Sequence, residues 1–169
     1  DWEIQDSMDL QLDKKALPWQ EIKEFVIALE TNDPEVQIAV QMLLKWDGYL
    51  NENSPEASIY EEFLSQLVKS IAMDRAPNSS DWVMGKGFHP LSELTFFAAR
   101  RVSHTVKCLR ERPQHWFASS SWDEQIEKAL SNSVKVLKET HGTDQSKWGW
   151  GYTRKLTIPH FMSAKEPFN

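Results

Sequence analysis

Residues 54–71, which read SPEASIYEEFLSQLVKSI, are the stretch of this chain that decides its fold. Ser54 is a favourable N-cap, and Pro55 suits the first helical position, where a missing backbone N–H costs nothing. The apolar residues that follow recur at helical spacing. They are Ile59, Tyr60, Phe63, Leu64, Leu67, Val68 and Ile71. A stripe this regular faces a protein core, so the stretch predicts a long core helix and no ligand site.

Two helices are predicted on the N-terminal side of this stretch. Residues 19–29 carry an apolar stripe and follow Pro18, which suits the start of a helix. Asp33 and Pro34 then form an N-cap and first helical position, and Gly48 is the expected stop of that second helix.

Two more helices are predicted on the C-terminal side. Residues 91–109 carry an apolar stripe that ends before Pro113, after a predicted loop at residues 74–86. Ser121 and Glu124 form a capping box for the last helix, and Gly142 closes it. The fold class expected from these patterns is mainly α, a layer of about five helices.

The helical spacing of apolar residues ends at Gly142. Residues 148–152 (WGWGY) and 156–158 (LTI) predict one extended segment, a strand for which no partner strand is evident in this sequence. We therefore divide the chain into a helical region, residues 1–142, and an extended segment, residues 143–169, that joins a sheet elsewhere. The chain begins with Asp1 and shows no signal-type run, so we expect a piece of a longer protein.

Composition excludes several classes of protein. Hydrophobic residues make up 40% and charged residues 26% of the chain, which is typical of a globular protein. No apolar run approaches the roughly 18 residues of a membrane span, so none is predicted. The formal net charge of −6 repels phosphate backbones, so no nucleic-acid partner is expected. The one cysteine, Cys108, excludes an internal disulfide and a multi-cysteine zinc site.

Few residues suggest chemistry of their own. His104 and Cys108 are spaced i, i+4 on a predicted helix, but no third metal ligand has suitable spacing, so a packed thiol is the favoured interpretation. Cys108 with His104 or His115 is also the only conceivable nucleophile pair, and nothing around it matches a known nucleophile motif. Asp6, Asp9 and Asp13 fit a solvated acidic face better than a cation site.

Two basic motifs and the tryptophans complete the list of candidates. Residues 100–101 (RR) favour ion pairing, and residues 85–87 (GKG) lack the spacing of a phosphate-binding loop. The eight tryptophans suit helix ends and interfaces, where an indole N–H finds a backbone carbonyl, or could line an apolar acyl-binding pocket. We therefore predict no catalytic, cofactor-binding or metal-binding residue in this sequence.

Three stretches in order resemble one family. They are residues 10–13 (LQLD) with 17–18 (LP), residues 43–48 (LLKWDG) with 54–61, and residues 148–152 (WGWGY) with 156–160 (LTIPH). Together they resemble the middle of the large (β) chain of penicillin acylases, the penicillin amidase family of N-terminal-nucleophile hydrolases. The third stretch departs from the family pattern, because Tyr152 and the order Pro159-His160 stand where the family has a histidine and then histidine-proline-leucine.

The resemblance implies that this chain is part of a larger amidohydrolase with an αββα core. In the family an N-terminal serine is the nucleophile and its α-amine is the base, and the oxyanion donors and calcium ligands also lie outside the matched region. Its implied partners are the rest of the acylase polypeptide and, for the whole enzyme, a small N-acyl amide substrate. Family likeness implies an extracytoplasmic location. The segment itself would be structural, shape the acyl cleft and be inactive alone.

A self-standing helical interaction module, with tryptophans that bind a partner protein, is the alternative function. The unpaired strand expected near Leu156 favours the acylase interpretation over this module.

Overall fold

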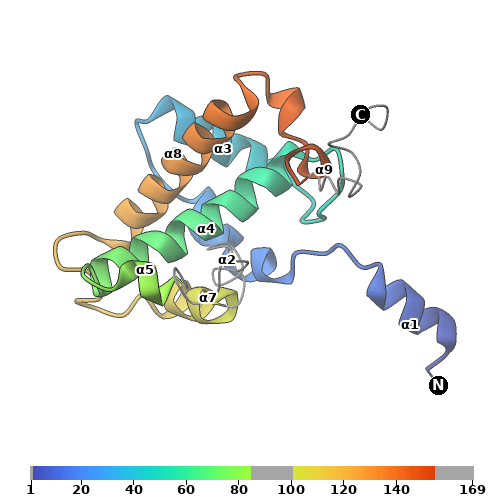
Figure 1. The fold of residues 1–169 in the computed structure, drawn as a ribbon, viewed down its shortest axis with the longest axis horizontal. Coiled ribbons are helices and arrows are strands. Elements are labelled where there is room, and N and C mark those ends of the chain that lie inside the picture. Colours follow the sequence, from blue (N-terminus) through green and yellow to red (C-terminus); the bar gives the residue numbers. More distant parts are fainter. Residues whose placement is uncertain (1, 85–100, 155–169) are drawn as a thin grey trace, which may run out of the picture.

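The computed structural model describes residues 2–84 and 101–154, and in this part of the chain the secondary structure is helical. Figure 1 shows α4 (Pro55–Arg75) crossing the middle of the body, with α8 (Trp122–His141) antiparallel to it. Helices α2 (Leu17–Ile27) and α3 (Pro34–Lys45) pack against each other, and α3 also contacts α4 and α8. The mainly α fold class is thus confirmed. Within the described residues, no helix is both long and apolar enough to cross a bilayer.

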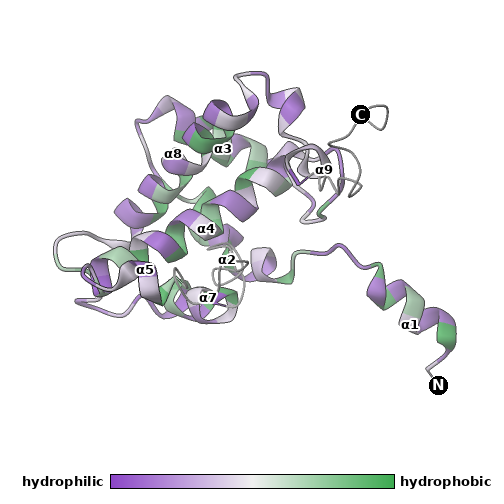
Figure 2. Cartoon of the chain, in the orientation of Figure 1, coloured by the Kyte–Doolittle hydropathy of each residue, from purple (hydrophilic) through white to green (hydrophobic). Residues whose placement is uncertain are grey.

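Helix α4 forms as its sequence predicts. The Ser54 hydroxyl accepts a hydrogen bond from the Ala57 backbone N–H at 3.2 Å, and Pro55 occupies the first turn. The predicted stripe is buried except for Ile71, which is partly buried against the same core. In Figure 2 the hydrophobic residues of α4 accordingly lie along the inside of the body. The cap and the apolar stripe that the sequence predicts are therefore the cap and the buried face that α4 has in the structure.

Local capping signals fix the starts of two other helices. Asp33 caps α3 by accepting from the Glu35 N–H at 2.9 Å. Ser121 caps α8 by accepting from the Glu124 N–H at 3.2 Å, while the Glu124 carboxylate accepts from the Ser121 N–H at 2.6 Å. Both predicted N-caps are confirmed, because each side chain satisfies a backbone donor that the first helical turn leaves unpaired.

An aromatic cluster joins α2, the end of α3 and α4. The ring centroids of Trp19, Trp46 and Tyr60 lie 5.0 to 5.8 Å apart. Trp46 is held there because its indole N–H donates to the Tyr49 carbonyl at 3.1 Å. Burial, with a further contribution from the Glu61 charge, raises the pKa of the Tyr60 phenol well above its ordinary value. Tyr60 is therefore a neutral core residue.

The turn at residues 46–49 connects this cluster to the N-terminal segment. Gly48 has φ +85°, and a side chain here would meet Gln20 and Trp19. Its carbonyl accepts from the Ala16 N–H at 2.8 Å, and Lys15 and Tyr49 form an isolated antiparallel bridge. A positive φ and close approach explain why glycine follows the Trp46-Asp47 pair.

The structure corrects the predicted loop at residues 74–86. Helix α4 continues to Arg75, and α5 (Ser80–Val83) is a short helix. This helix is stabilised because the next residue, Met84, is buried against Val68 and Ala72 of α4. Residues 85 and 86 lie outside the described part of the chain.

The predicted extended segment is wrong where the structure describes it. Residues of this segment form the 3₁₀ turn η1 (Gln145–Trp148) and the helix α9 (Trp150–Thr153). Tertiary contacts cause the difference: Trp148 is fully buried with its indole N–H on the Gly142 carbonyl, and the Gly151 N–H donates to the Glu52 carbonyl at 2.8 Å. Small glycines let this segment approach the turn before α4. The expected strand residues 156–158 lie outside the described residues.

Helix α7 (Val102–Glu111) covers the described part of the stripe predicted at residues 91–109. It packs against α2, and residues 91–100 lie outside the described part. Arg112 follows it with φ +42°, and the backbone turns there just before Pro113. Gly142 likewise ends α8 with φ +83°. Both helix ends agree with the predicted stops.

The capping box of α8 predicts a pH-dependent contribution to stability. Backbone and side-chain hydrogen bonds with Ser121 lower the pKa of Glu124, so its stabilising contribution is present above the unfolded-state pKa and is lost as pH falls through the folded-state pKa. We expect Ser121→Ala to lower the free energy of unfolding by about 1 kcal/mol at neutral pH. Glu124→Gln should make the free energy of unfolding depend less on pH in the acid range, because the titrating carboxyl group is removed. Urea unfolding at a series of pH values measures both effects. Ser119→Ala, in the exposed loop before the cap, is the matched control. If Ser119→Ala lowered the free energy of unfolding as much as Ser121→Ala, this assignment would be contradicted.

Candidate functional site

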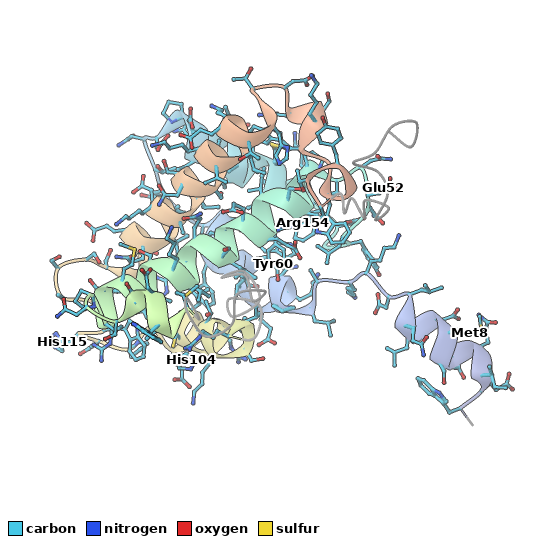
Figure 3. All side chains as sticks on the ribbon, in the orientation of Figure 1. Met8, Glu52, Tyr60, His104, His115 and Arg154 are labelled. Atoms are coloured by element: carbon cyan, nitrogen blue, oxygen red, sulfur yellow. The ribbon has the colours of Figure 1, made fainter. Side chains whose placement is uncertain are left out.

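The predicted pair on α7 does come together. The Cys108 Sγ and His104 Nε2 atoms lie 3.5 Å apart, so the two side chains share one face of α7 (His104 is labelled in Figure 3). Within residues 2–84 and 101–154, no three His, Cys, Asp or Glu side chains cluster as a metal site would require. The pair is a contact between two side chains of one helix.

The Cys108 thiol is buried in the core between helices. Burial raises its pKa, the Glu111 charge raises it further, and Lys107 acts in the opposite direction. A raised pKa reduces the thiolate fraction at neutral pH, and the thiolate is the nucleophilic form. Cys108 is therefore a packed, weakly reactive thiol, as the favoured interpretation expects.

The three N-terminal aspartates act as local hydrogen-bond acceptors. Asp6 accepts from the Glu3 N–H at 2.7 Å in a capping box, Asp9 accepts from the Gln5 amide at 2.7 Å, and Asp13 accepts from the Lys15 N–H at 2.9 Å. Each carboxylate thus has its own partner within its own segment. This agrees with the interpretation of an exposed acidic face.

The predicted basic spot is only partly described. The Arg101 guanidinium donates to the Val83 carbonyl at 2.9 Å, so here it binds backbone and ties the start of α7 to α5. Arg100 and residues 85–87 lie outside the described residues.

Several tryptophans bind backbone carbonyls as expected. The indole N–H groups of Trp46, Trp122 and Trp148 donate to the carbonyls of Tyr49, Pro113 and Gly142 at 2.9 to 3.3 Å. These three rings are buried parts of the core. They stabilise helix ends and turns, so they do not form a shared ligand pocket.

The surface that stands out is the N-terminal arm, residues 2–12, which contains α1 (Ile4–Gln11). None of the residues of α1 is buried, and Figure 1 shows α1 projecting from the helical body. Its large apolar side chains are between 51% and 83% exposed. They are Trp2, Ile4, Met8, Leu10 and Leu12. Figure 3 shows Met8 on this arm, well separated from Tyr60 in the body.

Sequence reasoning missed the arm as a surface, although a signal was present. Ile4 and Met8 are spaced i, i+4, which places them on one side of a helix. An isolated helix of eight residues is too short to be stable in water by itself. The arm therefore has the properties of a docking element.

Comparisons with known proteins agree on one family. The family model described as penicillin amidase matches residues 1–169. The chain is also similar to acyl-homoserine lactone acylase QuiP from Pseudomonas fluorescens, with 26% identity over an alignment of 140 positions that covers 78% of this chain. The match spans only 16% of that acylase.

The environment of Cys108 predicts slow thiol chemistry. We expect a disulfide exchange reagent at neutral pH to modify native Cys108 several-fold more slowly than the urea-unfolded chain, because burial and a raised pKa both reduce access to the thiolate. His104→Ala should leave this rate nearly unchanged. A native rate equal to the unfolded rate, or one that depends strongly on His104, would show an activated thiol.

Proposed function

The chain belongs to the penicillin amidase family, and on this premise we propose that it is a helical, non-catalytic layer of an enzyme that hydrolyses N-acyl amide bonds. The similar acylase is roughly six times longer than the matched region, since the match covers 16% of it. Most of such an enzyme would thus lie outside residues 1–169.

The proposed chemistry is acyl transfer to a serine followed by hydrolysis. The serine hydroxyl of the larger protein attacks the amide carbonyl, and the α-amine of the same serine accepts the hydroxyl proton. That amine then passes the proton to the amide nitrogen, the C–N bond breaks and the amine product leaves. Water then cleaves the acyl-serine ester and releases the carboxylic acid. We assign these catalytic groups to the larger protein and none of them to residues 1–169.

The observation that carries the structural role is the exposed N-terminal arm. Five large apolar side chains on so short a segment would be costly to keep in water, since each one gains about 1.5–3 kcal/mol on full burial. A segment that gains this much from burial needs a complementary surface, and the larger hydrolase would supply it. The helical body provides a stable base for the arm, because its own core is already formed.

The proposed substrate class follows from the name of the similar acylase. We propose that the larger protein removes the acyl group from N-acyl homoserine lactones or similar small N-acyl amides. From the likeness to the family, and not from that name, we propose that the larger protein lies outside the cytoplasm, which cell fractionation tests. Shaping of the acyl cleft by this layer is part of the same proposal.

We expect the full-length protein to release homoserine lactone from N-acyl homoserine lactones. Mass spectrometry of the products separates amide cleavage, which gives a fatty acid and the intact lactone, from lactone opening, which keeps the acyl chain attached. The matched control is the substrate analogue in which a methylene replaces the amide carbonyl. Lactone opening alone would contradict the proposed amide hydrolysis, and no cleavage of any N-acyl amide or lactone would favour a helical interaction module.

The docking role of the arm has its own test. In the full-length protein, we expect Met8→Cys to react with a maleimide several-fold more slowly than Asp9→Cys, because Met8 lies on the apolar side of α1 and Asp9 does not. The two variants should react equally after unfolding in urea. Equal rates in the folded protein would show that the arm stays exposed to solvent.

A further inference from the structure

A cavity of about 240 Å³ lies between α4, α5, α7 and the loop that carries Trp116. Its apolar lining comprises Val68, Ile71 and Ala72 of α4, together with Val83 and the Trp116 ring. Val68 and Ala72 belong to a small second core cluster, separate from the main core. The cavity therefore lies at an edge of the body where the main core does not fill the space.

Two guanidinium groups reach this cavity from different helices. Arg75, at the end of α4, stacks over the Trp116 ring at 4.9 Å and donates to the Trp116 carbonyl at 3.1 Å. Arg101, at the start of α7, is held by its hydrogen bond to Val83. Each of these hydrogen bonds uses one of the five N–H donors of a guanidinium. The backbone contacts thus orient both groups beside the cavity.

The Trp116 ring contributes apolar surface to the cavity wall, while its indole nitrogen is enclosed within the protein. The Trp116 Nε1 atom is buried and has no hydrogen-bond partner in the described part of the chain. Buried N–H groups are almost always paired, and one without an acceptor is costly. Two neutral polar side chains of the lining have partners of their own. The Thr105 hydroxyl donates to the Arg101 carbonyl at 3.1 Å, and the His104 ring contacts the Cys108 thiol.

The charged side chains that line the cavity are basic. None of the described residues that line the cavity is acidic. Asp74, which precedes Arg75, accepts a hydrogen bond from the Ala118 N–H at 3.3 Å, and Asp81 of α5 is not part of the lining. The cavity thus combines positive charge with an apolar wall.

We propose that this cavity binds a small monocarboxylate with an apolar tail. The planar carboxylate pairs with the Arg75 and Arg101 guanidinium groups. The tail lies against the α4 side chains that form the apolar wall. At about 240 Å³ the cavity is smaller than most pockets for drug-sized ligands, so the tail is a short chain or a single ring. The site is independent of the proposed amide hydrolysis.

Calorimetric titration of the full-length protein with hexanoate and phenylacetate tests this site. We expect Arg75→Gln and Arg101→Gln each to weaken binding by roughly tenfold or more, because each removes a charge-assisted hydrogen bond. Both variants should still bind hexanol as the wild type does, because hexanol carries no charge that an arginine could pair with. Arg110→Gln is the matched control: this arginine is also on α7, but it pairs with Glu21 outside the cavity, and its loss should leave binding unchanged.

Two results would overturn the proposal. The first is that the wild type and both arginine variants bind the acids with equal affinity. Binding of the acid only at a catalytic centre elsewhere in the protein would give this same result. The second is phosphate that binds as tightly as hexanoate, since phosphate makes no use of the apolar wall. If both arginine variants unfold, Ala76→Leu decides, because a leucine at this lining position fills the cavity and should abolish binding without altering either arginine.

Discussion

Burial of helix α4 is the constraint on which the rest of this structure depends. Residues 57–60 are buried one after another, so the first turns of α4 are covered on every side. Helices α3, α5, α8, η1 and α9 each contact α4 and supply part of that cover. The buried Ser58 hydroxyl is compatible with this position because it pairs with the Thr153 hydroxyl at 3.0 Å. Each of these elements is thus positioned by the part of α4 that it covers.

Two features lie outside this self-contained packing, and both point to binding. The arm of α1 has apolar side chains that the body does not cover, which is expected of one layer of a larger penicillin amidase family protein. The cavity beside Trp116 is lined by two guanidinium groups, each of which has N–H donors beyond the one that binds a backbone carbonyl. The apolar arm needs an apolar surface to cover it, and the positively charged cavity needs an anion. The two features therefore require partners of different chemistry.

Most helix starts and the pair on α7 could be predicted from the sequence. Asp33, Ser54 and Ser121 act within three residues of themselves, so their sequence neighbours specify their hydrogen bonds. His104 and Cys108 meet because i, i+4 residues always share a helix face. The cavity could not be predicted in this way, because Arg75, Arg101 and Trp116 are distant in sequence and come together only where α4, α5, α7 and the loop of Trp116 meet in the folded chain.

The sequence by itself determined the mainly helical class, the caps, and the membership of residues 43–48 in a family pattern. Tertiary structure decided the conformation of residues 145–153, where alternating tryptophan and glycine indicate a strand but the chain forms η1 and α9. The physical reason is that caps and stripes are local, whereas this segment gains more by burying Trp148 and donating two backbone N–H groups to Ser54 and Glu52 than by extending. Only the folded neighbour, the turn before α4, could supply those acceptors.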